Sequence, residues 1–281
     1  MKVKIVEDSI SPEGNRITTF HVRYWRPIHS ELMTHRVFSR NARSSRAVPV
    51  MTLLKEDIFV PTFGMNQPGM QSSAVPVDPE ILDRWEDEWR QLAEITRSFV
   101  KRWGEQGMHK QWANRPLEWF GWIDVLITST SWENFWALRD HEDAQPELGR
   151  LAREMRKALK ESRPNSLKPG EWHLPYVKED EKSSLPIRLQ LQLSTARCAR
   201  LSYRPFDGRA DHQAEYARHD KLVVSRPVHA SPAEHQATPD QKDWGQGDSY
   251  NEKVWLSPEL HGNFEGWVQY RKTLENEAVK G

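Results

Sequence analysis

Apolar residues recur along this chain with different periods, and these periods predict where it forms strands and helices. Residues 15–25 are rich in β-branched and aromatic types, which favours a strand. Residues 28–40 are predicted to turn helical. The clearest helix is predicted over 78–103, where apolar residues recur every three or four positions, Asp78 can cap the first turn and Pro79 suits its start.

Further segments complete the predicted organisation. Helices are expected over 117–128, around 132–140 and over 148–159, where apolar residues fall on one face. The last segment, 262–278, is also expected to be helical. The polar stretch 61–79 carries Pro and Gly and is expected to be a loop.

A charged run interrupts the chain at residues 178–184, where no residue is apolar. Runs of charge are typical of solvated linkers. We interpret this run as a seam between two parts of the chain.

Charge and composition exclude several classes of protein. Lys and Arg total 40 and so do Asp and Glu, which argues against binding nucleic acid by bulk electrostatics. No apolar run approaches the ~20 residues of a membrane span, and the N-terminus lacks the apolar core of a secretory signal. A single cysteine excludes an internal disulfide framework. We therefore expect a cytoplasmic protein that engages neither nucleic acid nor membrane.

The densest polar cluster covers residues 34–46 and contains four arginines, three serines, a histidine and an asparagine, with no Lys or Glu. Arginine binds phosphate and carboxylate through a planar fork, whereas lysine offers a point charge. The cluster therefore favours a site for a phosphorylated ligand. An ordinary basic surface segment is the alternative that composition leaves open.

Two more arginines, Arg115 and Arg139, lie among aromatic residues. A buried guanidinium needs an anion or hydrogen-bond partner, because an unpaired buried charge is costly. The partner is either a nearby acid, such as Glu118 or Glu133, or a phosphate or base carbonyl of a ligand.

Neither metal chemistry nor a cysteine nucleophile is predicted. His229, Glu234 and His235 lack the His-Glu-x-x-His spacing, and Pro232 interrupts any helix there. Cys198 is expected to be a small buried hydrophobe rather than a nucleophile.

These residues resemble the flavin-dependent thymidylate synthases. The hallmark of that family is Arg-His-Arg, seven residues and then Ser. Here Thr-His-Arg at 34–36 is followed after seven residues by Ser44, with Arg46 two positions further on. The segment 132–148 resembles the family's Asn-Phe-x-x-Leu-Arg…Ala-Gln-x-Glu-Ile segment, and Arg115 lies near the place of an upstream Ala-Arg pair.

The other family segments are present but out of order. An Ala-Arg-x-Ser-Tyr element and a His-Gly-Ser-Pro-x-Glu-His element usually open the family sequence. Their counterparts here, 199–203 and 229–235, lie near the C-terminus. We infer a circular permutation, which proteins tolerate when the old termini lie close together and the new ones fall in exposed loops.

Several family positions carry different residues in this chain. Thr34 replaces the first Arg of the hallmark, and Ala42 replaces a Glu before the motif Ser. Glu31 stands where the family has Gln, and Thr128 and Thr130 stand where an Asn-x-Arg helps to hold flavin.

The resemblance implies an α+β fold in one domain over 1–281, with helices packed on a small, mostly antiparallel sheet. It implies a homotetramer with shared active sites, FAD as cofactor, and NADPH and methylenetetrahydrofolate as co-substrates in the methylation of dUMP to dTMP. Flavin contacts are implied at His35, Arg36, Asn134, Ser231 and Glu234. Nucleotide contacts are implied at Glu31, Ser44, Arg46, Arg115 and Arg139.

Arg139 is the implied catalytic residue, because it would contact the pyrimidine and stabilise negative charge that develops on the base. Two alternatives remain. The first is the modification of another pyrimidine nucleotide on the same fold, and the second is a nucleotide-binding protein without catalysis.

Overall fold

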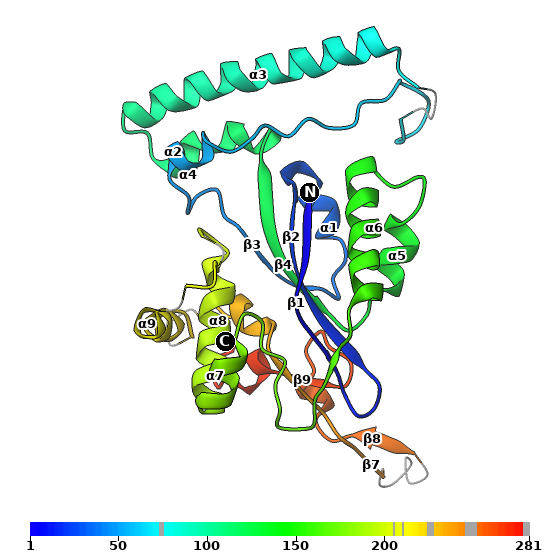
Figure 1. The fold of residues 1–281 in the computed structure, drawn as a ribbon, viewed down its shortest axis with the longest axis vertical. Helices are drawn as coiled ribbons and strands as arrows, with labels where there is room; N and C mark the ends of the chain where they lie inside the picture. Colours follow the sequence, from blue (N-terminus) through cyan, green and yellow to red (C-terminus); the bar gives the residue numbers. More distant parts are fainter. Residues whose placement is uncertain (73–75, 205, 210, 224–227, 245–251, 278–281) are drawn as a thin grey trace.

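The computed structural model describes residues 1–72, 76–204, 206–209, 211–223, 228–244 and 252–277 (Figure 1). The strands are β1 (Lys2–Ile10), β2 (Arg16–Trp25), β3 (Ser39–Ala42), β4 (Trp122–Ser129), β5 (Asn165–Ser166), β6 (Ala237–Pro239), β7 (Lys242–Trp244), β8 (Lys253–Trp255) and β9 (Trp267–Gln269). The α-helices are α1 (His29–Leu32), α2 (Val50–Leu53), α3 (Pro79–Glu105), α4 (Lys110–Ala113), α5 (Glu133–Arg139), α6 (Pro146–Glu161), α7 (Glu179–Ser184), α8 (Ile187–Arg200) and α9 (His212–Val223). Short 3-10 helices include η1 (Arg26–Ile28), η2 (Arg115–Trp119), η3 (Ser231–Glu234), η5 (Pro258–Leu260) and η6 (Tyr270–Thr273).

One five-stranded sheet organises the molecule, in the order β3-β4-β2-β1-β5. All its pairs are antiparallel except β1 with β5, and β2 pairs with β4 along its length, from Thr18↔Ser129 to Trp25↔Trp122. Helices α5 and α6 lie against one face (Figure 1). On the other face Leu126 of β4 packs against Cys198 and Leu201 at the end of α8. The α+β architecture predicted from the sequence is confirmed.

An apolar core fills the space between the sheet and helices α5 and α6. Its largest members alternate along β2 and β4 and recur at helical spacing in α5 and α6, namely Phe20, Val22, Tyr24, Ile123, Val125, Ile127, Phe135, Leu148, Leu151 and Met155. The predicted strand 15–25 and the helices near 132–140 and 148–159 are confirmed.

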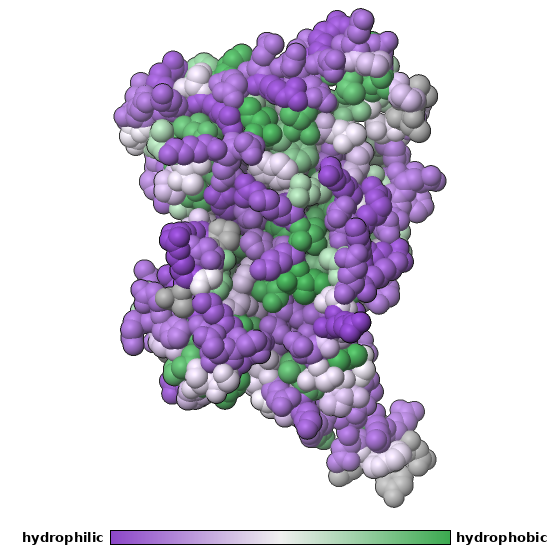
Figure 2. Space-filling view, viewed as in Figure 1, coloured by the Kyte–Doolittle hydropathy of each residue, from purple (hydrophilic) through white to green (hydrophobic). Residues whose placement is uncertain are grey.

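The long helix α3 is also confirmed, with Asp78 accepting a hydrogen bond from the Glu80 N–H at its start. Its apolar stripe is only partly covered, because Leu92, Ile95 and Phe99 keep 41–56% of their surface exposed. Figure 2 likewise shows hydrophobic residues near α3 that interrupt the polar surface. The described residues between 61 and 78 contain neither helix nor strand, as predicted, and Pro79 already belongs to α3.

The prediction of a helix over 117–128 was wrong. This segment forms η2 and then β4, the strand between β2 and β3. Every residue from Ile123 to Ser129 is buried, so the strand carries no alternation of polar and apolar residues. A strand covered on both faces has the same one-dimensional pattern as a buried helix.

Two other helix predictions were wrong. Within 28–40 only α1 is α-helical, and the hallmark segment continues into β3, which pairs with β4. The C-terminal segment from Gly262 forms β9 and η6, because β9 pairs with β6 and buries Trp267 completely. Long-range strand pairing decides the structure in both places.

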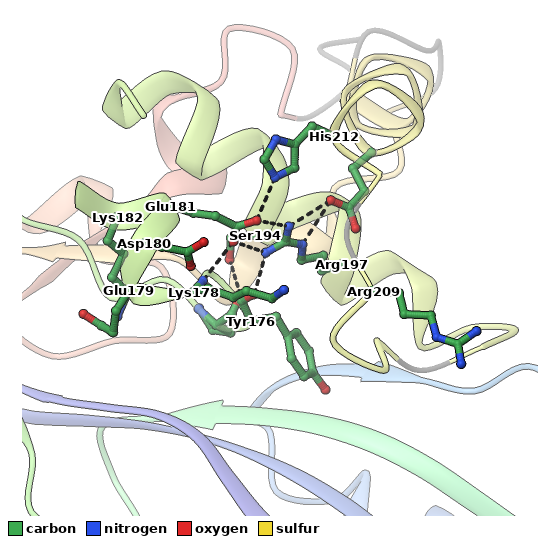
Figure 3. A network of polar contacts seen from close by, with 12 residues as sticks. Tyr176, Lys178, Glu179, Asp180, Glu181, Lys182, Ser194, Arg197, Arg209 and His212 are labelled. Carbon is green, nitrogen blue, oxygen red and sulfur yellow. Dashed lines mark hydrogen bonds and ion pairs between the residues drawn. The ribbon is translucent and has the colours of Figure 1, made fainter. Parts of the chain in front are cut away.

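The charged run 178–184 is not a solvated linker but contains helix α7. Glu181 of α7, Arg197 of α8 and His212 of α9 point toward one another in Figure 3. The fully buried Arg197 guanidinium donates two hydrogen bonds to Glu181, at 2.5 and 2.6 Å, and two to Glu215. Burial alone would raise the pKa of Glu181, but the hydrogen bonds that it accepts outweigh burial and lower the pKa to about 2. That this run is the seam of a permuted chain stays a prediction.

A buried chain of hydrogen bonds joins the sheet to the C-terminal part of the protein. Thr128 Oγ1 lies 2.8 Å from His235 Nδ1 and 2.7 Å from Thr19 Oγ1. Thr19 Oγ1 lies 2.8 Å from His173 Nε2, and the other ring nitrogen of His173 contacts Ser9 at 2.9 Å. Burial lowers the pKa of His235 to about 3 and the pKa of His173 well below its usual value. Both imidazoles are therefore neutral in the folded protein near pH 7.

We predict that His235→Gln makes the free energy of unfolding fall less steeply as the pH is lowered below 6.5. His235 binds a proton below pH 6.5 in the unfolded chain but only below about pH 3 in the fold. Its contribution is therefore complete above pH 6.5 and is lost as the pH falls toward 3, at up to about 1.4 kcal/mol per pH unit. Urea unfolding between pH 7 and 4 measures the slope. The matched variant His141→Gln replaces an exposed histidine and should keep the original slope, and an equal slope in both variants would contradict the prediction.

Candidate active site

Arg139, the predicted catalytic residue, contacts the hallmark segment just before β3 begins. Arg139 Nε donates to His35 Nε2 at 3.1 Å, and its Nη2 donates to Thr34 Oγ1 at 3.4 Å. Its Nη1 lies 3.6 Å from Glu31 Oε2. We call Glu31, Thr34, His35 and Arg139 the His35 half-site. Segments 104 residues apart in sequence are thus in direct contact.

His35 positions Arg139 as a neutral acceptor. Its ring is 5% exposed, with the Phe38 ring 5.6 Å and the Phe135 ring 4.9 Å away. Burial, followed by the positive charges of Arg139 and Arg40, lowers the pKa of His35 to about 4. Because Nε2 accepts the hydrogen bond from Arg139, we assign the ring proton to Nδ1.

The four arginines of the hallmark cluster divide into two pairs with different roles. Arg40 donates to the carbonyls of Leu32, Met33 and His35, which fixes the loop before β3. Arg43 is buried against two acids of the neighbouring elements. Arg36 and Arg46, in contrast, are exposed and have no ion pair within the described residues.

A second group of predicted residues lies beyond the other end of β3. Ser44 N–H donates to the Ser202 carbonyl at 3.0 Å. Next to it, the Ser45 hydroxyl donates to Glu118 at 2.5 Å, and Arg115 pairs with the same carboxylate at 3.1 Å. We call Ser44, Ser45, Arg46, Arg115 and Glu118 the Ser44 half-site. Arg115 is about half exposed and takes the nearby acid as its partner.

A single chain does not bring all the predicted nucleotide arginines into one pocket. The His35 half-site lies before β3 and the Ser44 half-site lies after it, and β3 is an extended strand paired with β4. Arg139 therefore belongs to one end of the strand, and Arg46 and Arg115 belong to the other.

The residues predicted for the flavin are distributed between the surface and one cleft. Asn134, on α5, and Arg36 are exposed. Glu234 pairs with Arg271 of η6. Ser231 lines a cleft of about 700 Å³, which we call the Ser231 cleft, together with Asn41, Ser202, Tyr203, Arg218 and Lys221.

The Ser231 cleft joins three segments that the resemblance separates along the chain. Asn41 comes from the hallmark strand, Ser202 from the Ala-Arg-x-Ser-Tyr counterpart and Ser231 from the His-Gly-Ser-Pro counterpart. In the described part of the chain the hydroxyls of Ser202 and Ser231 have no hydrogen-bond partner. Unpaired donors around a cleft of this size suit a nucleotide cofactor.

Two positions that hold flavin in the family are used for internal contacts here. Thr128 is buried against Thr19 and His235, and Thr130 Oγ1 accepts the N–H of Glu265 at 3.0 Å. These contacts tie the C-terminal segment to the end of β4. If flavin binds this chain, other residues must replace that pair.

Sequence reasoning missed a charged cluster on the sheet beside Ser44. Asp124 of β4 accepts from Arg23 at 2.6 Å and lies 3.2 Å from His21 Nε2 and 3.6 Å from Arg43. Burial would raise the pKa of Asp124, but the His21 hydrogen bond and the two guanidinium charges lower it. The cluster lines a second cleft of about 980 Å³. An acid inside the apolar run 122–127 was the signal that could have revealed it.

The structure also bears on three other possibilities, namely a reactive cysteine, a metal site and a membrane span. Burial raises the pKa of the Cys198 thiol, which keeps the sulfur protonated. Within the described ranges no three His, Cys, Asp or Glu side chains gather as metal ligands, and His235 is bonded to Thr128 instead. No helix of the described chain is both long and apolar enough to cross a bilayer.

Comparison with known proteins identifies the family. The profile of the thymidylate synthase complementing protein family, Thy1, matches residues 15–165. The chain belongs to this family. Membership confirms the resemblance found in the sequence and the expectation of a nucleotide methyltransferase-like enzyme.

Solved structures with a similar fold include a UMP/dUMP methylase, PolB, from Streptomyces cacaoi, bound with 5-Br UMP and with 5-Br dUMP. Both are 18% identical to this chain and cover 56% of it, with TM-scores of 0.47 and 0.48, and the matches span 88% and 89% of the methylase chains. No curated protein sequence matches the chain significantly.

We predict that Arg139→Gln raises the pKa of His35, because the variant removes the largest positive charge acting on the ring. Burial, the main cause of the shift, remains, so the pKa should rise above about 4 and stay below 6.5. Imidazole chemical shifts followed by NMR during a pH titration measure it. The control is Arg156→Gln on α6, which breaks an ion pair with Asp140 and lies away from His35. An unchanged His35 titration in Arg139→Gln would contradict the contact.

Proposed function

We propose that this protein transfers a one-carbon unit to C5 of a pyrimidine deoxynucleotide, with reductive methylation of dUMP to dTMP as its reaction. FAD is the proposed cofactor, and NADPH and methylenetetrahydrofolate are the proposed co-substrates. The observation that carries the proposal is the hydrogen bond from Arg139 to His35. It unites the two segments that carry the family resemblance, although they lie far apart in sequence.

The chain's own residues can supply binding and electrostatics for this reaction. Arg139 is held by a neutral imidazole rather than by a tight carboxylate pair, so much of its charge is free to stabilise an anionic base. Arg46 is exposed, and its fork suits the phosphate dianion. Arg115 would add to that site only when the phosphate competes with Glu118.

The flavin would be held by His35, Arg36, Asn134, Ser231 and Glu234. Bound FAD, once reduced by NADPH, would supply the electrons for the reductive step. Ser231 lines the cleft of unpaired donors, which supports this placement, and Glu234 would first have to loosen its pair with Arg271.

We further propose that the active site is shared between subunits of a homotetramer. The two half-sites lie at opposite ends of β3, so Arg46 of one subunit would meet Arg139 of another. Leu92, Ile95 and Phe99 lie at helical spacing on α3 and are exposed, which supports a subunit contact on that helix.

A second candidate is a related modification of another pyrimidine nucleotide. Thr34 and Thr128 differ from the family residues, and both are engaged within the chain, Thr34 with Arg139 and Thr128 with His235. The surroundings of the base and the flavin therefore differ from the family pattern.

The test of the function is direct. The purified protein should show a flavin absorbance band or take up added FAD, and it should convert dUMP when given NADPH and methylenetetrahydrofolate. Turnover of dCMP but not dUMP would favour the second candidate. A protein that takes up no FAD would overturn the flavin proposal.

We predict that two arginine variants fail in different ways. Arg139→Ala should lower turnover about 10²–10³-fold while FAD remains bound, because one charge next to the reacting base is lost. Arg46→Ala should mainly weaken dUMP binding, about tenfold or more, because a charged hydrogen bond to phosphate is lost. Steady-state kinetics, dUMP calorimetry and flavin absorbance separate the two, with exposed Arg84→Ala as control. Equal loss of flavin in both variants would contradict these roles.

We also predict that Arg139→Ala and Arg46→Ala rescue each other when activity is measured at a dUMP concentration too low to saturate Arg46→Ala. If each site combines Arg46 from one subunit with Arg139 from another, random exchange of equal amounts leaves about one quarter of the sites intact. Activity should therefore return after the subunits are dissociated, mixed and reassembled. Activity at limiting dUMP that does not rise above the average of the two separate variants, although native mass spectrometry detects mixed oligomers, would mean that both arginines serve the same subunit's site.

A further inference from the structure

The lining of the Ser231 cleft contains more positive charge than the resemblance accounts for. Arg218 and Lys221, both on α9, line the cleft, and none of the described lining residues is acidic. The other ionisable side chains among the described lining residues are Tyr203 and His229. The potential inside the cleft is therefore positive.

Arg218 has no partner that would explain its position. Its Nη1 is buried without a hydrogen-bond acceptor, and the residue makes no ion pair with any described residue. Its guanidinium carbon lies 5.9 Å from the centre of the Tyr203 ring, which is a weak contact at most. Arg197, on helix α8, in contrast pairs its guanidinium with two carboxylates. A buried N–H without an acceptor is costly, so this guanidinium favours an anionic ligand in the cleft.

The spacing of the two cations indicates the kind of anion. Residues three apart on a helix lie about 5–6 Å apart at Cβ, so Arg218 and Lys221 can contact two neighbouring phosphates. Ser202, in the turn after α8, and Ser231, in η3, add hydroxyl donors to the same lining. The Tyr203 ring, 40% exposed, offers a flat surface for a base or a sugar. The cleft volume of about 700 Å³ suits a ligand of nucleotide size.

We propose that the Ser231 cleft binds the diphosphate group of a nucleotide through Arg218 and Lys221. The inference rests on the proposed function in one respect, because a dinucleotide cofactor would bring such a group to Ser231. The diphosphate chemistry does not depend on it, since a free nucleoside diphosphate presents the same charges. Arg218 is a binding residue in this proposal, and the methyl-transfer site is elsewhere.

The test is calorimetric binding to the full-length protein, with ADP, AMP, inorganic pyrophosphate, FAD and dUMP as separate probes. ADP and pyrophosphate should bind, and ADP should bind more tightly than AMP. Arg218→Gln and Lys221→Gln should each weaken ADP binding about tenfold or more. Arg84→Gln on α3 removes an equal charge from an exposed position away from the cleft, and it should leave ADP binding unchanged.

The FAD probe distinguishes the two sources of the diphosphate. A parallel loss of FAD and ADP binding in Arg218→Gln supports a dinucleotide, and loss of ADP alone supports a separate nucleoside diphosphate. The inference would be overturned if ADP and pyrophosphate failed to bind, or if they bound the Arg218, Lys221 and Arg84 variants equally. The exposed Lys221 variant keeps the test valid if Arg218→Gln unfolds, which circular dichroism would detect.

If the proposed function is wrong, the dUMP measurements give a different result from the one expected when only the inference about Arg218 is wrong. In that case dUMP would not bind, or would bind without turnover, whatever residue stands at 218. If the function is right and the inference wrong, dUMP binds and reacts while Arg218→Gln has the ADP affinity of the unmodified protein.

Discussion

The buried guanidinium of Arg197 is the interaction on which the C-terminal half of this protein depends. A charge taken fully out of water is tolerated only with matched partners, and here Glu181 of α7 and Glu215 of α9 both supply them. The carbonyl of Tyr176 accepts a further hydrogen bond at 2.8 Å from a backbone with φ of 67°, a conformation that costs a non-glycine residue energy. Three helices are therefore fixed around one side chain, and a helix that moved would leave a buried charge unpaired.

That arrangement determines where the hallmark strand and both clefts lie. The end of α8 holds β3 through two contacts: the Cys198 carbonyl accepts from the Asn41 side chain at 2.7 Å, and the Ser202 carbonyl accepts from the Ser44 N–H. These partners are more than 150 residues apart in sequence, yet the contacts join the hallmark segment to the end of α8 and the turn after it. Such contacts require only that the two segments lie close together in space, and they can form whatever the order of the segments along the chain. They support our proposal that the chain is a permuted member of the family.

The sequence was informative where one side of an element faces solvent. Capped amphipathic helices such as α3 and α6 could be predicted because their apolar stripes have a helical period. The same reasoning failed for β4, whose two buried faces leave no period, and for β3 and β9, which exist only because distant strands pair with them. Within the site, the resemblance led to His35 and Arg139. Composition could not reveal that Arg40 and Arg43 serve the fold, or that Arg218 lacks a partner, because the difference lies in which neighbours the fold provides.

The division of the site along β3 has a consequence for assembly. An extended strand paired along its length cannot bend to bring its two ends together, so the distance between Arg139 and Arg46 is a property of the sheet. In the proposed shared site, the sheet of a second subunit would supply the end of the nucleotide site that the first subunit lacks. The partly uncovered apolar stripe of α3 gives association a driving force of its own, independent of any ligand. In the proposed oligomer, β3 would couple the packing of subunits to nucleotide binding. Substitutions that alter subunit packing would therefore change nucleotide binding without replacing a residue of either half-site.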